Sequence, residues 1–143
     1  MPAPLHLVKL SVGTQDVNSL TLWQDQPQAQ TADGYPRHIT RMWPRRAAEL
    51  LDGGSIYWVI KGIVLCRQNI IRLDEIDRGD GIRRCAIVMT PELHRTTPAP
   101  RRPFQGWRYL QATDAPPDLT GALPGEEALP LALSEALAEI GVL

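Results

Sequence analysis

The sequence lacks the features that mark several protein classes. Its 143 residues hold only two cysteines, Cys66 and Cys85, fewer than a disulfide-stapled domain needs. No apolar run approaches the ~18 residues of a membrane-spanning helix, and residues 1–4 lack the basic and apolar regions of a signal peptide. We therefore expect a single cytoplasmic domain over residues 1–143, with both cysteines reduced in the core. A disulfide between them is the alternative.

Signatures of metal binding and catalysis are also missing. The three histidines, His6, His38 and His94, lie far apart, and no spacing of Cys, His, Asp or Glu matches a ligand set. There is no Gly-x-Ser-x-Gly motif, and Gly53-Gly54-Ser55 opens a strand, whereas a P-loop opens a helix. The acidic run in residues 74–80 straddles a turn, which favours a solvated turn over a cation site. We predict neither cofactor nor metal, and no reaction can be assigned.

Charge is distributed unevenly behind a net charge of −1. Residues 37–108 hold fourteen of the fifteen basic residues and carry a net +7, whereas residues 1–36 carry −2 and residues 109–143 carry −6. Thirteen of the bases are arginine, which suits bidentate contacts with phosphates and stacking on aromatic rings. This asymmetry indicates an anionic partner. Internal pairing of the arginines with the acidic flanks is the structural alternative.

The strongest local signal is the helix–turn–strand pattern of residues 41–62, RMWPRRAAELLDGGSIYWVIKG. Pro44 suits the first turn of a helix that Ala47 to Leu51 continue, and Gly53-Gly54 supplies a left-handed residue to end it. SIYWVI is aromatic and β-branched, which predicts a strand over residues 55–60. Lys61-Gly62 is then a tight turn.

The rest of the chain predicts short strands joined by turns. Asp16 is a good N-cap for a short helix that buries Val17, Leu20 and Trp23. Strands are expected at residues 5–12, 35–42, 63–76 (one bent strand or two short ones), 83–90 and about 107–110, with extended Pro-rich connections at 91–103 and 111–130 and a C-terminal amphipathic helix over about 131–140. His6 and Lys9 are placed on or near the solvent side of the first strand. This order indicates an α+β fold with a mainly antiparallel curved sheet, whose closure into a small barrel is left open.

Two segments interleave arginines with aromatic rings, at residues 41–46 and 101–109. Single-stranded nucleic acid is bound by this combination, because cations follow the phosphates while aromatic faces stack on bases. Arginine–tryptophan contacts that only stabilise the fold are the alternative. The predicted nucleic-acid-binding residues are Arg41, Trp43, Arg45, Arg46, Lys61, Arg101, Arg102, Trp107 and Arg108. We expect the two segments to share one face.

Three segments resemble an uncharacterised family of small bacterial proteins, a domain of unknown function. They are residues 41–62, residues 80–89 (DGIRRCAIVM) and residues 100–110 (PRRPFQGWRYL), within a likeness that runs from about Leu5 to Leu119. Membership in that family implies no established activity.

The order of a short helix, Gly53-Gly54, Tyr57-Trp58 and Lys61-Gly62 is more distantly similar to the PUA-like superfold, including its ASCH and EVE branches. That resemblance implies barrel strands and a basic cleft facing RNA or modified bases. The ASCH-type pattern of Gly-x-Lys followed by Glu and Arg is not reproduced after Gly54, so no ligand pocket is carried over.

These observations lead to one function hypothesis and two alternatives. The leading hypothesis is a small cytoplasmic domain that binds nucleic acid, RNA in particular, through the arginine–aromatic residues. The first alternative is an interaction module in which the basic centre docks an acidic protein, or the acidic end of a second copy in a homodimer. The second is a small enzyme acting on a phosphorylated or nucleotide substrate, with Asp74, Asp77 or His94 as acid–base.

Overall fold

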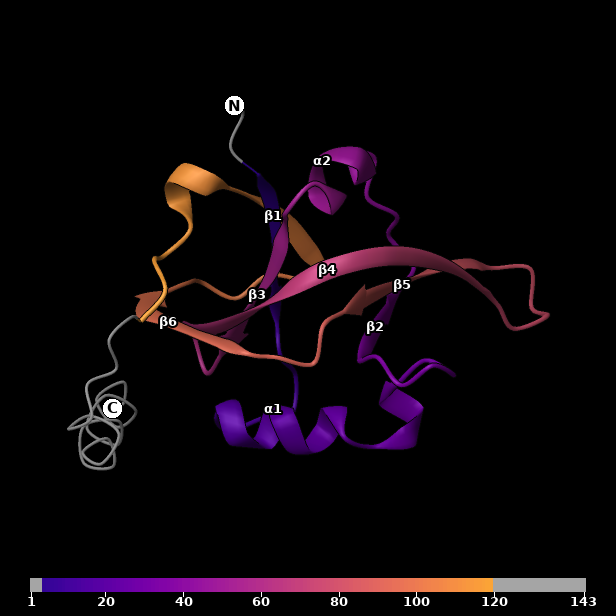
Figure 1. Cartoon of the computed structure of the whole chain (residues 1–143), viewed down its shortest axis with the longest axis horizontal. Helices are drawn as coiled ribbons and strands as arrows, with labels where there is room; N and C mark the ends of the chain where they lie inside the picture. The colour runs from indigo at the N-terminus through magenta and orange to yellow at the C-terminus, as the bar shows by residue number, and fades with distance from the viewer. Residues whose placement is uncertain (1–3, 120–143) are drawn as a thin grey trace.

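The computed structural model of the chain describes residues 4–119, and one mixed sheet of seven strands forms its centre (Figure 1). The strands are β1 (Leu5–Leu10), β2 (Arg37–Thr40), β3 (Ser55–Ile60), β4 (Ile63–Asp77), β5 (Arg83–Met89), β6 (His94–Pro100) and β7 (Trp107–Gln111). Their order is β2-β5-β4-β3-β1-β7, with β6 also paired to β4. In the described part, β1 and β3 are parallel and the other five pairs are antiparallel. The predicted α+β class and mainly antiparallel sheet are confirmed, and the sheet is open.

β4 holds the sheet together because it changes partners along its length. Its first part, residues 63–69, pairs with β3 and also with β6, and its second part, residues 70–77, pairs with β5. The pairing register shifts between Ile70 and Arg72, and a bulge of this kind bends a strand and increases its twist. Figure 1 shows β4 as one long curved ribbon across the molecule. Of the two sequence-based alternatives for this segment, one bent strand is therefore confirmed.

β3 is the most buried strand, since all six of its residues are buried. Gly53 enters it with φ of +92°, and the chain leaves it through Lys61 and Gly62 with φ of 53° and 81°. Two successive left-handed residues are typical of a two-residue hairpin turn whose twist matches the flanking strands. The predicted glycine stop and the Lys61-Gly62 turn are both confirmed.

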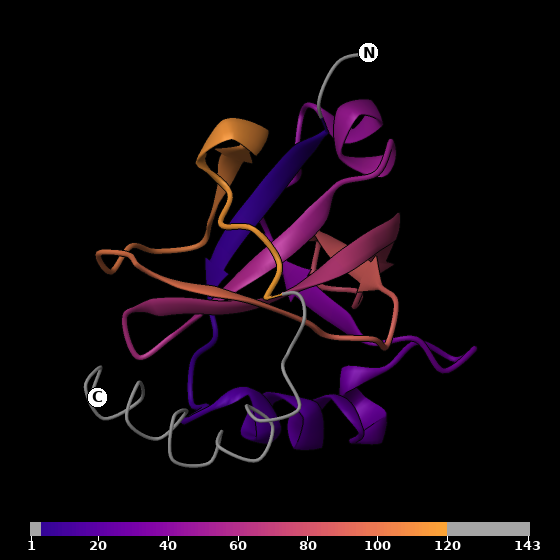
Figure 2. The same cartoon turned by 60° about the vertical axis from the view of Figure 1, so that its left-hand side comes forward.

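Two helices lie against the sheet, α1 (Val17–Gln24) and α2 (Ala47–Leu51), and two short 3₁₀ turns follow at η1 (Pro27–Ala29) and η2 (Ala112–Asp114). The predicted N-cap of α1 is confirmed, because the Asp16 carboxylate accepts a hydrogen bond of 2.8 Å from the Ser19 amide. α1 and α2 lie at opposite ends of the sheet in Figure 1, and Figure 2 shows β1 and β3 side by side above α1. Trp23 is 50% exposed, so its expected place in the core is wrong.

Apolar side chains form a cluster on each side of the sheet. The larger cluster joins Leu20 of α1 and Leu50 of α2 to Trp58 and other sheet residues, and the smaller is built around Tyr57 and Leu110. Both cysteines are buried and unpaired in the larger cluster. Burial raises the pKa of the Cys66 thiol to about 12 and that of Cys85 to about 11, so both stay protonated and unreactive at neutral pH.

The structure differs from expectation at His6 and within residues 91–103. His6 is buried, not solvent-facing, and its Nδ1 accepts a hydrogen bond of 3.0 Å from the Ser55 amide. Within the predicted connection at 91–103, residues 94–100 form β6. The expected C-terminal helix over 131–140 lies outside the described residues. None of the helices in residues 4–119 has the length and apolarity needed to cross a membrane.

Candidate functional site

The two arginine–aromatic segments meet at β7, although residues 47–100 separate them in the sequence. The Trp107 indole donates a hydrogen bond of 2.8 Å to the carbonyl of Met42. The Tyr109 hydroxyl accepts hydrogen bonds from the backbone amides of Arg45 and Arg46, at 2.8 and 3.0 Å. The backbone of the first segment is therefore fixed against β7, the edge strand of the sheet. These hydrogen bonds do not use the side chains of Met42, Arg45 and Arg46.

The alternation of side chains along β7 separates the arginines. Trp107 and Tyr109 pack against the larger cluster, on the side where residues 42–46 lie, whereas Leu110 packs with Phe104 in the smaller cluster. Because successive residues of a strand face opposite sides, Arg108 shares the Phe104 side. The segments are thus neighbours at one edge of the sheet, with their cations on its two sides and not on one shared face.

On the Phe104 side, three arginines gather around one aromatic ring, and we call this the arginine hollow (Arg101, Arg102, Pro103, Phe104 and Arg108). It encloses about 220 Å³. The guanidinium carbons of Arg101 and Arg108 lie 5.8 and 5.4 Å from the centre of the Phe104 ring. No salt bridge joins these arginines to an acid within residues 4–119, so no acid of the described residues compensates their positive charge.

On the other side, the first segment is partly neutralised. Arg46 forms two hydrogen bonds of 2.7 and 2.8 Å with the Glu49 carboxylate, and its guanidinium carbon lies 5.6 Å from the Tyr109 ring centre. Arg41 and Arg45 are exposed and are in no salt bridge with the described residues. Lys61 is in the β3–β4 turn, where its Nζ is 3.5 Å from the Gln15 side-chain oxygen, near the start of α1.

The two tryptophans predicted to face a ligand are covered by protein. Trp107 is 6% exposed, so its ring is part of the core. Arg83 lies over Trp43, with 4.0 Å between its guanidinium carbon and the centre of the ring, and cation–π contacts of this kind stabilise a fold. Phe104 lies among three arginines, of which Arg102 and Arg108 are exposed and Arg101 is half-buried.

The acidic run at the β4–β5 hairpin is paired internally. Asp74 binds Arg72 at 3.0 Å and Asp80 binds Arg84 at 2.9 Å. The Arg84 guanidinium holds the pKa of Asp80 at about 2, so this carboxylate stays charged. No group of three or more His, Cys, Asp or Glu in residues 4–119 is arranged to hold a metal ion.

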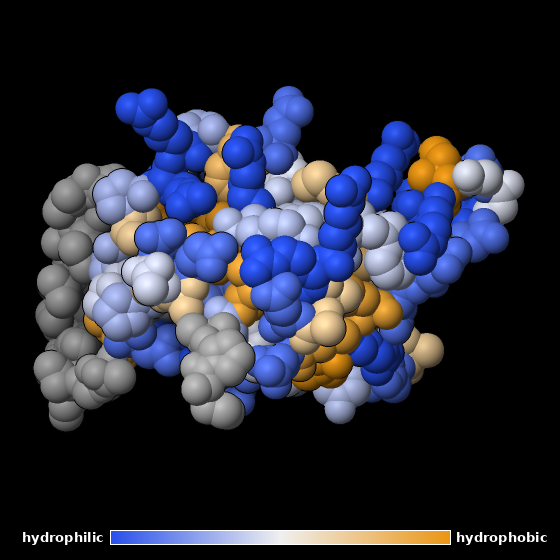
Figure 3. All heavy atoms as spheres, turned by 90° about the horizontal axis from the view of Figure 1, so that it is seen from above, coloured by the Kyte–Doolittle hydropathy of each residue, from blue (hydrophilic) through white to orange (hydrophobic). Residues whose placement is uncertain are grey.

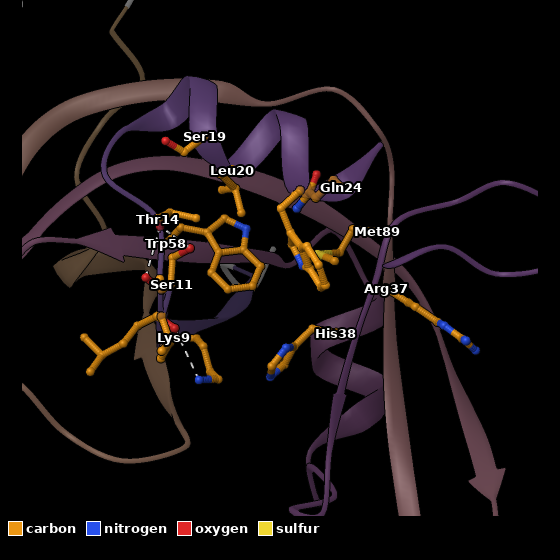
Figure 4. A pocket seen from close by; sticks show the side chains of 14 residues that line it. Lys9, Ser11, Thr14, Ser19, Leu20, Gln24, Arg37, His38, Trp58 and Met89 are labelled. Carbon is orange, nitrogen blue, oxygen red and sulfur yellow. Dashed lines mark hydrogen bonds between the residues drawn. The ribbon is translucent and has the colours of Figure 1, made fainter. Parts of the chain in front are cut away.

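A separate cavity lies between α1 and the sheet, and we call it the α1 pocket (Figure 4). Its volume is about 500 Å³, within the range of pockets that bind small molecules. The loop after β1 forms one end, and Leu20, Trp23 and Gln24 of α1 form the roof. The remaining walls come from β1, β2, β3 and β5 and include Lys9, Arg37, His38, Trp58 and Met89.

A buried polar network fixes the position of Trp58. The Gln68 side-chain oxygen accepts hydrogen bonds of 2.8 Å from the Trp58 indole and the Gln24 amide. The Gln68 amide in turn donates to the Gln24 side-chain oxygen at 2.8 Å and to the Thr90 carbonyl at 3.0 Å. Every polar group of the Gln68 side chain is thus satisfied, and this holds one wall of the α1 pocket rigid.

Two titratable side chains line the pocket, and burial shifts both. It lowers the pKa of His38 to about 4, with a smaller contribution from the Lys9 charge, so His38 is neutral at pH 7. The pKa of Lys9 is also lowered by burial. The His38 ring packs edge-on against Trp58 at 5.9 Å, and no side-chain hydrogen bond to it is found among residues 4–119.

Sequence reasoning missed this pocket because its residues come from five elements and form no motif. Lys9 appears in the sequence as a polar residue between apolar neighbours, and Arg37 and His38 lie far from it in another strand. The Arg37-His38 pair within a short strand was the available signal, since adjacent charged and titratable residues are unusual in a strand that packs on a core.

Comparison with known proteins gives a family and no activity. No curated protein and no solved structure matches the chain. A family model described as a protein of unknown function (DUF1489) matches residues 7–143. The match covers nearly the whole chain, and the protein therefore belongs to the DUF1489 family.

Proposed function

We propose that this protein binds single-stranded nucleic acid in the cytoplasm, with RNA as the preferred form. The observation that carries the proposal is the arginine hollow, where Arg101, Arg102 and Arg108 surround Phe104 without an acidic partner in residues 4–119. Guanidinium groups bind phosphate oxygens in bidentate geometry, and an aromatic ring stacks on any base. The preference for RNA rests on the distant PUA-like resemblance of residues 47–62.

Arg41 and Arg45 extend the proposed surface across the β7 edge. Both are exposed, and their segment is tied to β7 through Tyr109. A single nucleic acid strand bound to these cations would pass around the β7 edge, from the arginine hollow to residues 41–46. Lys61 lies at the β3–β4 turn and is a more distant candidate. Trp43 and Trp107 have no stacking role in this proposal. Arg83 lies over the Trp43 ring, and the Trp107 ring is buried in the core.

The test is binding of a fluorescently labelled single-stranded RNA, measured by anisotropy over a salt series. We expect the logarithm of the binding constant to fall linearly with the logarithm of salt concentration. The slope should change by about 0.7 for each phosphate-binding cation that is removed. The triple variant Arg101→Gln/Arg102→Gln/Arg108→Gln should therefore make the slope less negative by about 2 and weaken binding at low salt.

Arg78→Gln is the matched control, because Arg78 is an exposed arginine in the β4–β5 hairpin, away from β7. It should leave both affinity and slope unchanged. A second variant, Arg41→Gln/Arg45→Gln, measures the share of the first segment. No RNA binding at low salt, or a triple variant with the slope of the wild type, contradicts the proposal. Binding of polyglutamate in place of RNA would assign the basic surface to an acidic protein partner.

A further inference from the structure

The α1 pocket offers a mostly apolar space to a ligand. Trp58 and Met89 are buried in its walls, Leu20 covers it from α1, and the half-exposed Trp23 also lines it. In Figure 4 the side chains of Leu20, Trp58, Met89 and His38 surround a common space. Indole rings favour flat aromatic partners through stacked or edge-on contacts. The lining therefore suits a planar ring system.

The charges of the pocket select against a neutral or cationic ligand. Lys9 and Arg37 both line it, and none of its described lining residues is acidic. Arg37 lines the pocket, but Figure 4 shows its guanidinium directed away from Lys9 and His38. Within residues 4–119 the Lys9 Nζ donates one hydrogen bond, of 3.2 Å to the Leu10 carbonyl, and it keeps donor capacity for a ligand. An anionic group bound beside Lys9 would accept from that ammonium group.

His38 supplies a polar edge beside the aromatic wall. It is held edge-on to Trp58 at 5.9 Å, and it is neutral at physiological pH because burial lowers its pKa. A neutral imidazole has one N–H donor and one nitrogen acceptor, so it can pair with the donor and acceptor groups on the edge of a heterocycle.

We propose that the α1 pocket binds one nucleotide, with the base against Trp58 and His38 and the phosphate near Lys9. The ligand class is a nucleoside monophosphate, either free or as one residue of a nucleic acid strand. The lining residues of the pocket and of the arginine hollow are entirely different. The proposal therefore goes beyond strand binding at the hollow, and the two can fail independently.

The four indole N–H groups provide a direct test by two-dimensional ¹H–¹⁵N NMR, with signals assigned through single Trp→Phe variants. Trp23 and Trp58 line the pocket, whereas Trp43 and Trp107 do not. We expect titration with AMP, GMP, CMP or UMP to shift the Trp23 and Trp58 signals and to leave the other two in place. The matching nucleoside should bind about tenfold more weakly, because a charge-assisted hydrogen bond contributes on this scale. Inorganic phosphate alone should not produce the shifts.

Two variants and a strand probe complete the experiment. Lys9→Met keeps the aliphatic stem, removes the charge and should weaken monophosphate binding about tenfold. Arg37→Gln, which removes a guanidinium directed away from Lys9, and Arg78→Gln should have no such effect. A trinucleotide that shifts Trp58 where the free monophosphate does not supports the site as a reader of one strand residue. No shift at Trp58 with either probe, or equal binding of nucleoside and nucleotide, overturns the proposal. Shifts confined to Trp43 or Trp107 overturn it as well. The arginine hollow is intact in the Lys9 variant, so retained RNA binding by it separates the two proposals.

Discussion

Gly54 occupies a position that no other residue fits. An added Cβ would lie 2.2 Å from the Leu5 carbonyl oxygen and 2.5 Å from that of Leu50. Both contacts are with backbone atoms, which a side-chain rotation cannot relieve. The close approach is built in, since the Gly54 amide donates to the Leu50 carbonyl at 2.8 Å and its own carbonyl accepts from Ile70 at 3.0 Å. Gly54 thus joins β1, α2 and β4 at one point.

We predict that Gly54→Ala lowers the free energy of unfolding by about 3 kcal/mol or more, the upper range for overpacking a well-packed site. Gly53→Ala is the matched control. Gly53 has φ of +92°, and a methyl group added there would lie 3.9 Å from its nearest non-neighbouring atom, so alanine meets conformational strain alone, about 1 kcal/mol. Urea unfolding monitored by tryptophan fluorescence measures both. Equal losses would show that the close approach at Gly54 has no energetic weight.

For single residues, the sequence predicted the features that depend on neighbouring residues. It missed those that depend on residues far away along the chain. The Asp16 cap and the Gly53 stop were predicted, because both depend on adjacent backbone. Trp23 was expected in the core, yet it is half exposed, whereas the neighbouring Gln24 is buried. The reason is Gln68, 44 positions away, which satisfies the Gln24 amide and draws that face of α1 inward.

At the level of elements, hydrogen bonds between Gln24 and Gln68 join α1 to β4 of the sheet. Gln68→Leu would leave the Trp58 indole, the Gln24 amide and the Thr90 carbonyl without their partner. An unsatisfied buried polar group costs about 1–3 kcal/mol, so we expect the free energy of unfolding to fall by about 3 kcal/mol or more.

A double-mutant cycle separates the pair from simple packing loss. In Gln24→Leu/Gln68→Leu two of the unsatisfied amide groups disappear, and the double variant should be more stable than the sum of the single losses by at least about 1 kcal/mol. Urea denaturation of the four proteins provides the measurement. Strict additivity would mean that α1 is held by its apolar residues alone.

The strands show why element boundaries were predictable only in part. SIYWVI is β-branched and aromatic, and its strand assignment follows from composition. β6 contains Pro98 and Pro100, and a sequence reading therefore assigns the segment to a connection. It forms a strand because, among the described strands, it pairs with β4 alone, and an edge strand tolerates residues that lack an amide donor. Whether a strand is central or at an edge depends on the whole sheet, and the sequence of the segment alone does not determine it.

At the scale of the whole molecule, topology decides which charges lie together. β1 lies between β3 and β7 in the sheet, so the second arginine segment leads into the strand next to the first strand of the chain. The first segment reaches β7 through Met42 and Tyr109. Seen from the α2 end, in Figure 3, the surface is mostly hydrophilic and long polar side chains project from it. The sequence identified both arginine segments, whereas their division between two sides of β7 depends on strand alternation.

The α1 pocket also makes the stability of the whole protein depend on pH, through His38. Burial, with a smaller effect of the Lys9 charge, lowers the pKa of this histidine from 6.5 to about 4. Below pH 6.5 the unfolded chain takes up the proton first, so the stabilisation from neutral His38 is complete above pH 6.5 and is lost as the pH falls towards 4. A shift of this size corresponds to about 3 kcal/mol. His6 acts in the same direction, since burial first and the Arg67 charge second lower its pKa.

We therefore predict that the free energy of unfolding of the wild type falls steeply between pH 6.5 and pH 4, and that His38→Gln removes about 3 kcal/mol of this fall. The remaining slope in that variant belongs to His6. The carboxylates act in a lower window, because hydrogen bonds from Arg72 and Arg84 hold the pKa values of Asp33 and Asp80 at about 2, and their contribution is lost only between 3.8 and 2. Lys9→Met should flatten the curve slightly, since it removes one of the two causes of the His38 shift. Urea unfolding at half-unit steps of pH measures each curve, and identical slopes for wild type and His38→Gln would mean that His38 is not held neutral by the fold.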